Sequence, residues 1–199
     1  MLNRLLLGFC LLGLAACNSP GPSCYGEDGA LDIDLAQTDG WELGALPLWT
    51  TPDAVETTYG LPDGSVSVIE TPQGARPRTA VFGQPDTTDG PLLSPQFDLI
   101  GDTLAYPMFV SLQGRPLRAG ADTLYHGDSV RRFGEAFPRS YSCSDSTVVG
   151  WPYMDREGGD RVFIVADSVR RAAIAFFFRD DQLQAVGIDG YEGWRRAQL

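Results

Sequence analysis

The sequence predicts an α+β domain in which short helices pack on an antiparallel sheet. The chain has 199 residues and is 43% hydrophobic, a composition typical of a folded domain. Most of its apolar stretches are short and bounded by turn residues, as expected of strands. Two other stretches have helical spacing, and each begins at a hydroxyl cap and ends near a proline.

The first predicted helix follows Thr50-Thr51-Pro52-Asp53. In this stretch a hydroxyl cap precedes a proline at the first helical position and an acid in the first turn. Gly60 and Pro62 end the helix. Its short apolar face consists of Ala54, Val55, Thr58 and Tyr59.

Three strands are expected after this helix. They cover Val66 to Ile69, Thr79 to Phe82 and Leu104 to Leu112. Pro107 interrupts the third strand, and because proline cannot donate to the ladder, we expect either an edge strand or a bulge there. The region from Gln84 to Asp102 fits no predicted element.

A second helix is predicted after the cap formed by Gly127-Asp128-Ser129. Val130, Phe133 and Phe137 follow at helical spacing, and Pro138 is the expected stop. Further strands are expected around Tyr141 to Val149 and, after the Gly158-Gly159 loop, from Val162 to Ala166.

A closing hairpin is predicted from Ala172 to Phe178 and from Leu183 to Ile188, with its turn at Asp180-Asp181. Large and small residues alternate along the first of these strands, which favours strand. The alternative is a helix from Asp167 through Phe178, because Asp167 could cap it and alanine favours helix.

The amino terminus resembles the signal of a bacterial lipoprotein. After Arg4, the apolar run from Leu5 to Cys17 has 13 residues, too few to span a bilayer. Leu14-Ala15-Ala16-Cys17 resembles a lipobox, which implies that residues 1–16 are removed and that Cys17 becomes a lipidated amino terminus. Residues 17–30 are then a flexible tether and 31–199 the globular domain; plain secretion is the alternative.

The residue after Cys17 bears on localisation. Asn18, rather than aspartate, resembles the outer-membrane sorting pattern of Gram-negative bacteria. The resemblance implies an envelope protein held by its lipid anchor at the outer membrane and facing the periplasm. The formal net charge of −11 repels nucleic acid and anionic lipid headgroups, and nucleic acid is therefore not expected as a partner.

Two cysteines remain after this processing, Cys24 and Cys143, since Cys10 leaves with the signal. In an oxidising compartment such a pair usually forms a structural disulfide, and we expect one here. Closing so long a loop would contribute about 4–5 kcal/mol in the chain-entropy model. Two free thiols are the alternative.

Candidate catalytic and metal-binding residues are few. His126 could act as a base, but no nucleophile motif accompanies it, so a surface histidine next to a cap is favoured. Two groups of acids could hold a hard cation, but they match no calcium-loop spacing and are expected to be solvated. These acids are Asp28, Asp32, Asp34, Asp155, Glu157 and Asp160. We therefore expect no catalytic residue, metal or cofactor.

Arginine pairs are candidate interaction residues. The stretch 128–132, Asp-Ser-Val-Arg-Arg, recurs at 167–171, by coincidence or as a remnant of duplication. Guanidinium groups could bind carboxylates on a partner, but internal ion pairs are favoured in so acidic a chain. The candidates are Arg131, Arg132, Arg170, Arg171, Trp194 and Arg195.

A helix followed by antiparallel strands, occurring twice behind a lipobox, resembles the SmpA/OmlA-type small lipoproteins and the β-lactamase inhibitory protein. The resemblance covers Asp53 to Pro62, Asp128 to Pro138 and Ala172 to Ile188. It implies a non-catalytic protein that binds other envelope proteins. It also implies two related units, 40–115 and 116–191, as an alternative to one undivided domain.

Two classes of function follow. The favoured class is a lipid-anchored envelope lipoprotein that acts as a non-catalytic protein-interaction or structural module. The alternative is a periplasmic solute- or metal-binding protein, or a hydrolase, with an acidic cleft.

Overall fold

The computed structural model describes residues 32–60, 62–68, 78–82, 95–100, 102–143 and 161–189. Within these ranges the protein is mostly β, with a few short helices and sheets that are almost entirely antiparallel. The coarse part of the α+β prediction, short helices with antiparallel sheet, is therefore confirmed. The balance lies further toward strand than the sequence suggested.

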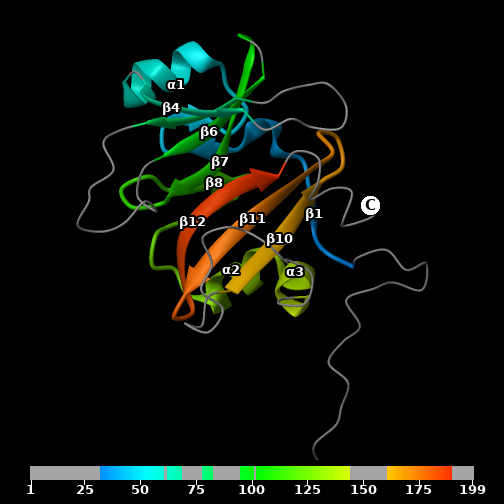
Figure 1. The fold of residues 1–199 in the computed structure, drawn as a ribbon. Coiled ribbons are helices and arrows are strands. Elements are labelled where there is room, and N and C mark those ends of the chain that lie inside the picture. Colours follow the sequence, from blue (N-terminus) through cyan, green and yellow to red (C-terminus); the bar gives the residue numbers. More distant parts are fainter. Residues whose placement is uncertain are drawn as a thin grey trace, which may run out of the picture.

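The larger sheet has eight strands, and their spatial order differs from their order in the chain (Figure 1). Neighbouring strands are antiparallel except the first two, which are parallel. From edge to edge they are β1 (Leu35–Ala36), β10 (Arg161–Asp167), β11 (Ala172–Arg179), β12 (Gln182–Asp189), β7 (Leu104–Ser111), β6 (Gln96–Ile100), β5 (Arg78–Phe82) and β4 (Pro62–Val68).

A smaller four-stranded sheet and four short helical segments complete the described chain. The small sheet has the order β3 (Leu46–Pro47), β2 (Glu42–Leu43), β8 (Leu117–Ala119) and β9 (Asp122–Leu124). The helices are α1 (Pro52–Tyr59), α2 (Val130–Ala136), α3 (Pro138–Ser142) and the 3-10 turn η1 (Thr38–Gly40).

The larger sheet is built from two meanders that meet at their last strands. β4 to β7 form one meander and β10 to β12 the other. They join where Val110 pairs with Val186 and Ser111 with Ala185. α1 precedes the first meander, and α2 with α3 precedes the second. The related units predicted over 40–115 and 116–191 stay a prediction.

Phe133 of α2 lies at the centre of the main core. Its side chain is fully buried, and ring centroids 4.9–5.6 Å away belong to Phe137, Phe163, Phe176 and Phe178. The small sheet and α1 contribute to the same cluster through Leu43, Leu117 and Val55, among others. The helices and the small sheet therefore pack on one face of the larger sheet.

The opposite face of the larger sheet is also apolar. Phe176 and Phe178 belong to the main core, whereas Phe177 between them belongs to a second cluster. Because side chains alternate along a strand, this second cluster lies on the other face. Its buried members are Phe109, Val162, Ala175, Phe177 and Ala185.

Both predicted helix starts are confirmed. The Thr51 hydroxyl accepts a hydrogen bond from the Ala54 amide at 3.3 Å, and the Ser129 hydroxyl accepts one from the Arg132 amide at 3.3 Å. Each cap satisfies a backbone donor that has no partner within its helix. α1 ends at Tyr59, before Gly60, as expected.

The strand predicted around Tyr141 to Val149 is wrong where the structure describes it, because Tyr141 belongs to α3. Pro138 does not simply stop α2; it is also the first residue of α3, a position that proline favours. The Tyr141 ring stacks on Phe163 at 6.0 Å between centroids, which holds the short helix against β10. Residues 144–149 lie outside the described part.

The closing hairpin is confirmed, and the alternative helix from Asp167 through Phe178 is wrong. β11 and β12 pair along their length, and the turn residues Asp180 and Asp181 have φ values of 52° and 60°. Two successive residues with positive φ form a turn whose twist matches that of the flanking strands. The pairing of β11 with both β10 and β12 uses the backbone groups that a helix would need.

Pro107 marks a bulge and not an edge. β7 lies between β12 and β6, so the edge alternative is wrong. Phe97 pairs with Pro107 and Gln96 with Phe109, which leaves Met108 as the extra residue of a bulge. The other predicted strands, at 66–68, 79–82 and 162–166, are confirmed, whereas Ile69 lies outside the described residues.

Several strands were not predicted. β6 lies in the region that fitted no element, and β1, β2, β3, β8 and β9 are only two or three residues long. Strands this short carry too few residues to display an alternating pattern.

We expect Gly187→Ala to destabilise the protein by about 1–3 kcal/mol, as overpacking of a core does. A Cβ atom at Gly187 would lie 2.1 Å from the carbonyl oxygen of Met108, in the bulge of β7. Urea unfolding measures the change. Gly40→Ala is the control, since a Cβ there has no neighbour within 4 Å; equal effects of the two substitutions would contradict the prediction.

Candidate functional site

The candidate site is the strap, which we define as residues 32–40. It runs along the outer edge of β10 and contains β1 and η1 (Figure 1). Leu35 and Ala36 pair in parallel with Ala166 and Asp167, and the Ala166 amide donates to the Asp34 carbonyl at 3.0 Å. The strap thus adds a short strand to the sheet edge.

The first part of the strap is held by α3. The Asp34 amide donates to the Ser140 hydroxyl at 3.0 Å, and the Ser140 amide donates to the Asp34 carboxylate at 2.8 Å. The Cys143 thiol lies 3.3 Å from the Asp32 carbonyl, and Arg139 lies 3.5 Å from the Asp32 carboxylate. These reciprocal contacts fix where the chain enters the domain.

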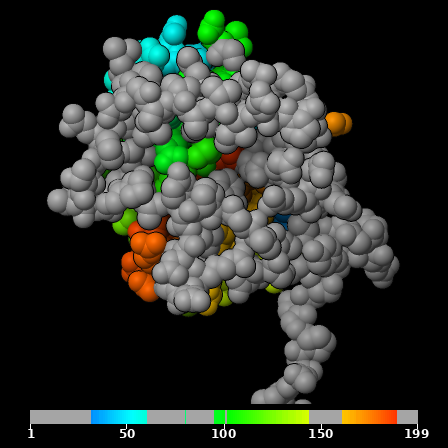
Figure 2. Space-filling model, viewed as in Figure 1, coloured from blue at the N-terminus to red at the C-terminus, as the bar shows by residue number. Residues whose placement is uncertain are grey.

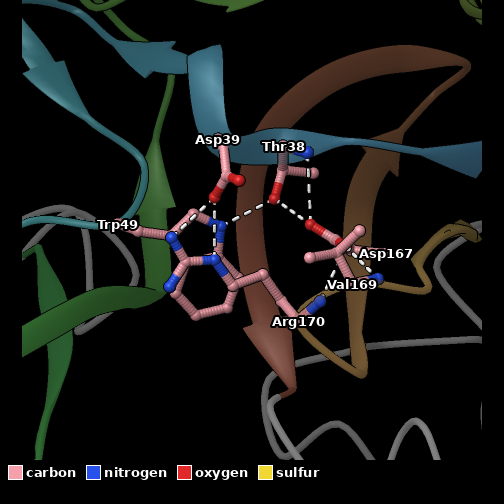
Figure 3. Close-up of polar contacts among 6 residues, drawn as sticks. All are labelled: Thr38, Asp39, Trp49, Asp167, Val169 and Arg170. Carbon is pink, nitrogen blue, oxygen red and sulfur yellow. Dashed lines mark hydrogen bonds and ion pairs between the residues drawn. The ribbon is translucent and has the colours of Figure 1, made fainter.

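The last part of the strap is held by the buried carboxylate of Asp167 (Figure 3). One carboxylate oxygen accepts from the Thr38 amide at 3.1 Å and from the Thr38 hydroxyl. The other accepts from the amides of Val169 and Arg170, both at 2.9 Å. Asp167 is 0% exposed, so it is a buried charge whose cost is offset by hydrogen bonds to both oxygens.

Trp49 and Arg170 extend this network (Figure 3), which ends at the exposed carboxylate of Asp39. The Trp49 indole N–H donates to the Thr38 hydroxyl oxygen at 2.6 Å. Arg170 donates to the Asp39 carboxylate at 2.6 and 2.9 Å, and its guanidinium carbon lies 5.1 Å from the Trp49 ring centroid. The strap, the turn after β10 and the chain before α1 are therefore joined in one cluster.

The hydrogen bonds of this cluster attach the strap to the end of β10. Both oxygens of Asp167 are occupied by donors from the strap and the turn, and no buried side-chain polar atom in the described residues lacks a partner. A carboxylate bonded in this way fixes its neighbours in place. The site joins the amino-terminal segment firmly to the sheet.

The predicted interaction arginines lie in two places. On α2, Arg131 lies 3.6 Å from Glu135, and Arg132 lies 2.9 Å from Asp122 and 3.8 Å from Glu135. In the turn between β10 and β11, Arg170 is paired with Asp39, and Arg171 is exposed. The two pairs are thus on separate elements. Trp194 and Arg195 lie outside the described residues.

The remaining candidates are not brought together. His126 is exposed, with its Nε2 atom 3.0 Å from the side-chain oxygen of Gln184. Asp32 and Asp34 hold the strap as described, while Asp28, Asp155, Glu157 and Asp160 lie outside the described ranges. Within those ranges, no group of three or more acid, His or Cys side chains could hold a metal ion. Nor does any helix there have the length and apolarity to cross a membrane.

Another polar contact lies at the end of α1. Burial raises the pKa of the Tyr59 hydroxyl above its usual 10.0, and the nearby positive charge of Arg115 opposes that shift. The Arg115 guanidinium carbon lies 5.0 Å from the Tyr59 ring centroid. The Tyr59 ring packs against the buried ring of Phe97. Neither Tyr59 nor Arg115 belongs to the strap.

Thr38, Trp49 and Asp167 were not predicted as site residues. The sequence did draw attention to Asp167, because it begins the second copy of the stretch that occurs at 128–132 and 167–171. In both copies the aspartate accepts backbone donors, since Asp128 accepts from the Tyr125 amide at 2.8 Å. The bonds from Asp167 to Thr38 connect residues 129 positions apart, a distance that no local pattern spans.

Comparison of the chain with protein-family models, with curated proteins and with solved structures gave no match.

We expect Asp167→Asn to destabilise the protein by about 2–3 kcal/mol, because the amide replaces one acceptor oxygen with a donor that faces other donors. Asp39→Asn is the matched control, since the exposed pair of Asp39 with Arg170 is worth at most about 1 kcal/mol. Urea unfolding of both variants measures the difference. A loss for Asp167→Asn no larger than the loss for Asp39→Asn would contradict the role of the buried carboxylate.

Proposed function

We propose that the protein is a lipid-anchored envelope lipoprotein whose folded domain is a non-catalytic protein-interaction or structural module. The observation that carries this proposal is the attachment of the strap. The lipobox-like stretch ends at Cys17, and the chain that follows it enters the domain at Asp32, where α3 and β10 hold it. The strap thus gives a segment that ends in a lipid anchor a fixed point of attachment on the fold.

The use of the polar side chains supports a non-catalytic domain. The buried polar groups around Asp167 and Ser140 are occupied by bonds that hold the strap. Arg131, Arg132 and Arg170 are paired with carboxylates of the same chain. In the described residues, therefore, the conspicuous polar clusters serve the fold.

The finer fold belongs to the same proposal. We infer two related helix-plus-strands units, one with α1 and β4 to β7 and one with α2, α3 and β10 to β12. The order of the strands supports this, because each helical segment precedes a meander and the two meanders meet through their last strands. Partners in this proposal are other envelope proteins, as the resemblance to SmpA/OmlA-type lipoproteins implies.

Lipidation at Cys17 is tested by metabolic labelling with palmitate in a Gram-negative host. We expect the wild-type chain to incorporate label and to fractionate with the outer membrane. Cys17→Ser should abolish both, because the thiolate is the group that is alkylated. Cys10→Ser is the matched control and should retain both; loss of label in this variant alone, or label retained by Cys17→Ser, would overturn the proposal.

Interaction with an envelope protein is tested by photo-crosslinking in intact cells. The chain contains no lysine, so amine-reactive reagents are unsuitable. We expect a benzoylphenylalanine at Tyr125, which is exposed, to capture a single envelope protein, whereas one at Ile100, an exposed apolar residue of β6, should not. Equal recovery from both positions, or none where a control lipoprotein gives an adduct, would count against an interaction module.

A further inference from the structure

We propose that the strap edge of the domain, formed by the strap, α3 and the turn after β10, faces the membrane, and that its partner is the lipid surface. This inference rests on the proposed function, because it requires the anchor at Cys17. It adds an orientation, which the proposed function leaves open, and assigns a surface that touches lipid.

The chain enters the domain at α3. Asp32 is held there by the ion pair of its carboxylate with Arg139, and Asp34 is bonded to Ser140. Any pull from the anchor therefore reaches the domain at this edge. The edge formed by β4 lies at the other side of the eight-stranded sheet.

The tether between Cys17 and Asp32 is long compared with the domain. Cys17 and Asp32 are 32 − 17 = 15 residues apart, so the extended chain reaches about 50 Å. A domain of this size is about 40 Å across, so that tether alone would let any side face the bilayer.

The predicted disulfide shortens this reach. Cys17 and Cys24 are 24 − 17 = 7 residues apart, and seven residues reach about 25 Å. A bond from Cys24 to Cys143 would therefore hold the end of α3 closer to the bilayer than the domain is wide. The Asp32 carbonyl lies 3.3 Å from the Cys143 thiol, so the chain leading back to Cys24 starts beside its proposed partner.

The surface of the strap edge carries exposed apolar side chains. Leu35 and Val169 are the two most exposed large apolar side chains of the described residues, at 63% and 62%. Leu35 pairs with Ala166 at the end of β10, and Val169 lies in the turn that begins directly after it. That turn lies at the outer edge of the molecule (Figures 1 and 2). Leu35 lies in the middle of the strap and Val169 beside its last part, so exposed aliphatic side chains follow this edge and suit the apolar boundary of a lipid surface.

Charge at this edge is compatible with a membrane despite the acidic chain. Asp32 and Asp39 are paired with Arg139 and Arg170, which leaves their carboxylates locally compensated. Arg171 is exposed in the same turn, and its positive charge balances the negative charge of the Asp34 carboxylate, so this edge carries no net negative charge that would repel anionic headgroups.

The test uses the lipidated full-length protein in vesicles that contain a labelled anionic phospholipid. Benzoylphenylalanine is placed at Leu35, at Val169 or, as the control, at Ile100. Ile100 is also an exposed apolar residue, at 38%, but it belongs to β6, five strands away from β1. We expect several-fold more lipid adduct from Leu35 and Val169 than from Ile100. Equal adducts from all three, or most from Ile100, would overturn the inference.

The contribution of the disulfide is measured in the same assay. Intact mass before and after reduction establishes whether Cys24 and Cys143 are bonded. We expect Cys24→Ser, which leaves the buried Cys143 in place, to lower the adducts at Leu35 and Val169 several-fold. Unchanged adducts would show that the disulfide does not orient the domain. Protein that carries no lipid at Cys17 and does not bind the vesicles refutes the proposed function, whereas bound protein without an edge preference refutes only this inference.

Discussion

The hydrogen bonds of the buried Asp167 carboxylate are the interaction on which the attachment of the strap to the sheet depends. The carboxylate accepts bonds from Thr38 in the strap and from the two amides that shape the turn after β10. Removal of any one donor leaves part of a charge unsatisfied in a buried place, which is costly. The strap, the end of β10 and the start of β11 therefore form one unit, and the sheet edge, the turn and the Trp49 contact are fixed together.

The rest of the fold is organised around Phe133. A seven-residue helix is too short to be stable alone, so α2 persists because its central side chain contacts rings from α3's start, β10 and β11. The second meander and its helices are one packing unit for this reason. The first meander joins it through β7, whose bulge brings Met108 against Gly187. The joint between the meanders is thus shaped by backbone geometry as well as by side chains.

Local signals were the part of the fold that the sequence could predict. The caps at Thr51 and Ser129 and the turn at Asp180-Asp181 each act within a few residues, and the structure confirms them. Tyr141 was misread because Pro138 serves both as the stop of one helix and as the start of the next. The candidate site could not be predicted, because Thr38 and Asp167 meet only through the parallel pairing of β1 with β10. Among the site residues, only those in the repeated Asp-Ser-Val-Arg-Arg stretch could be singled out from the sequence.

β1 has a consequence for solubility that is independent of any membrane. β10 would otherwise offer the donors and acceptors at its end to any extended chain, and open strand edges are templates for aggregation. The two residues of β1 occupy that end of the strand, and the bonds of the strap to Ser140 and Asp167 keep them there. Proteolysis before Trp41 would remove this protection, so trimmed chains should self-associate while the intact protein stays dispersed. The segment that fastens the domain also shields it from its own copies.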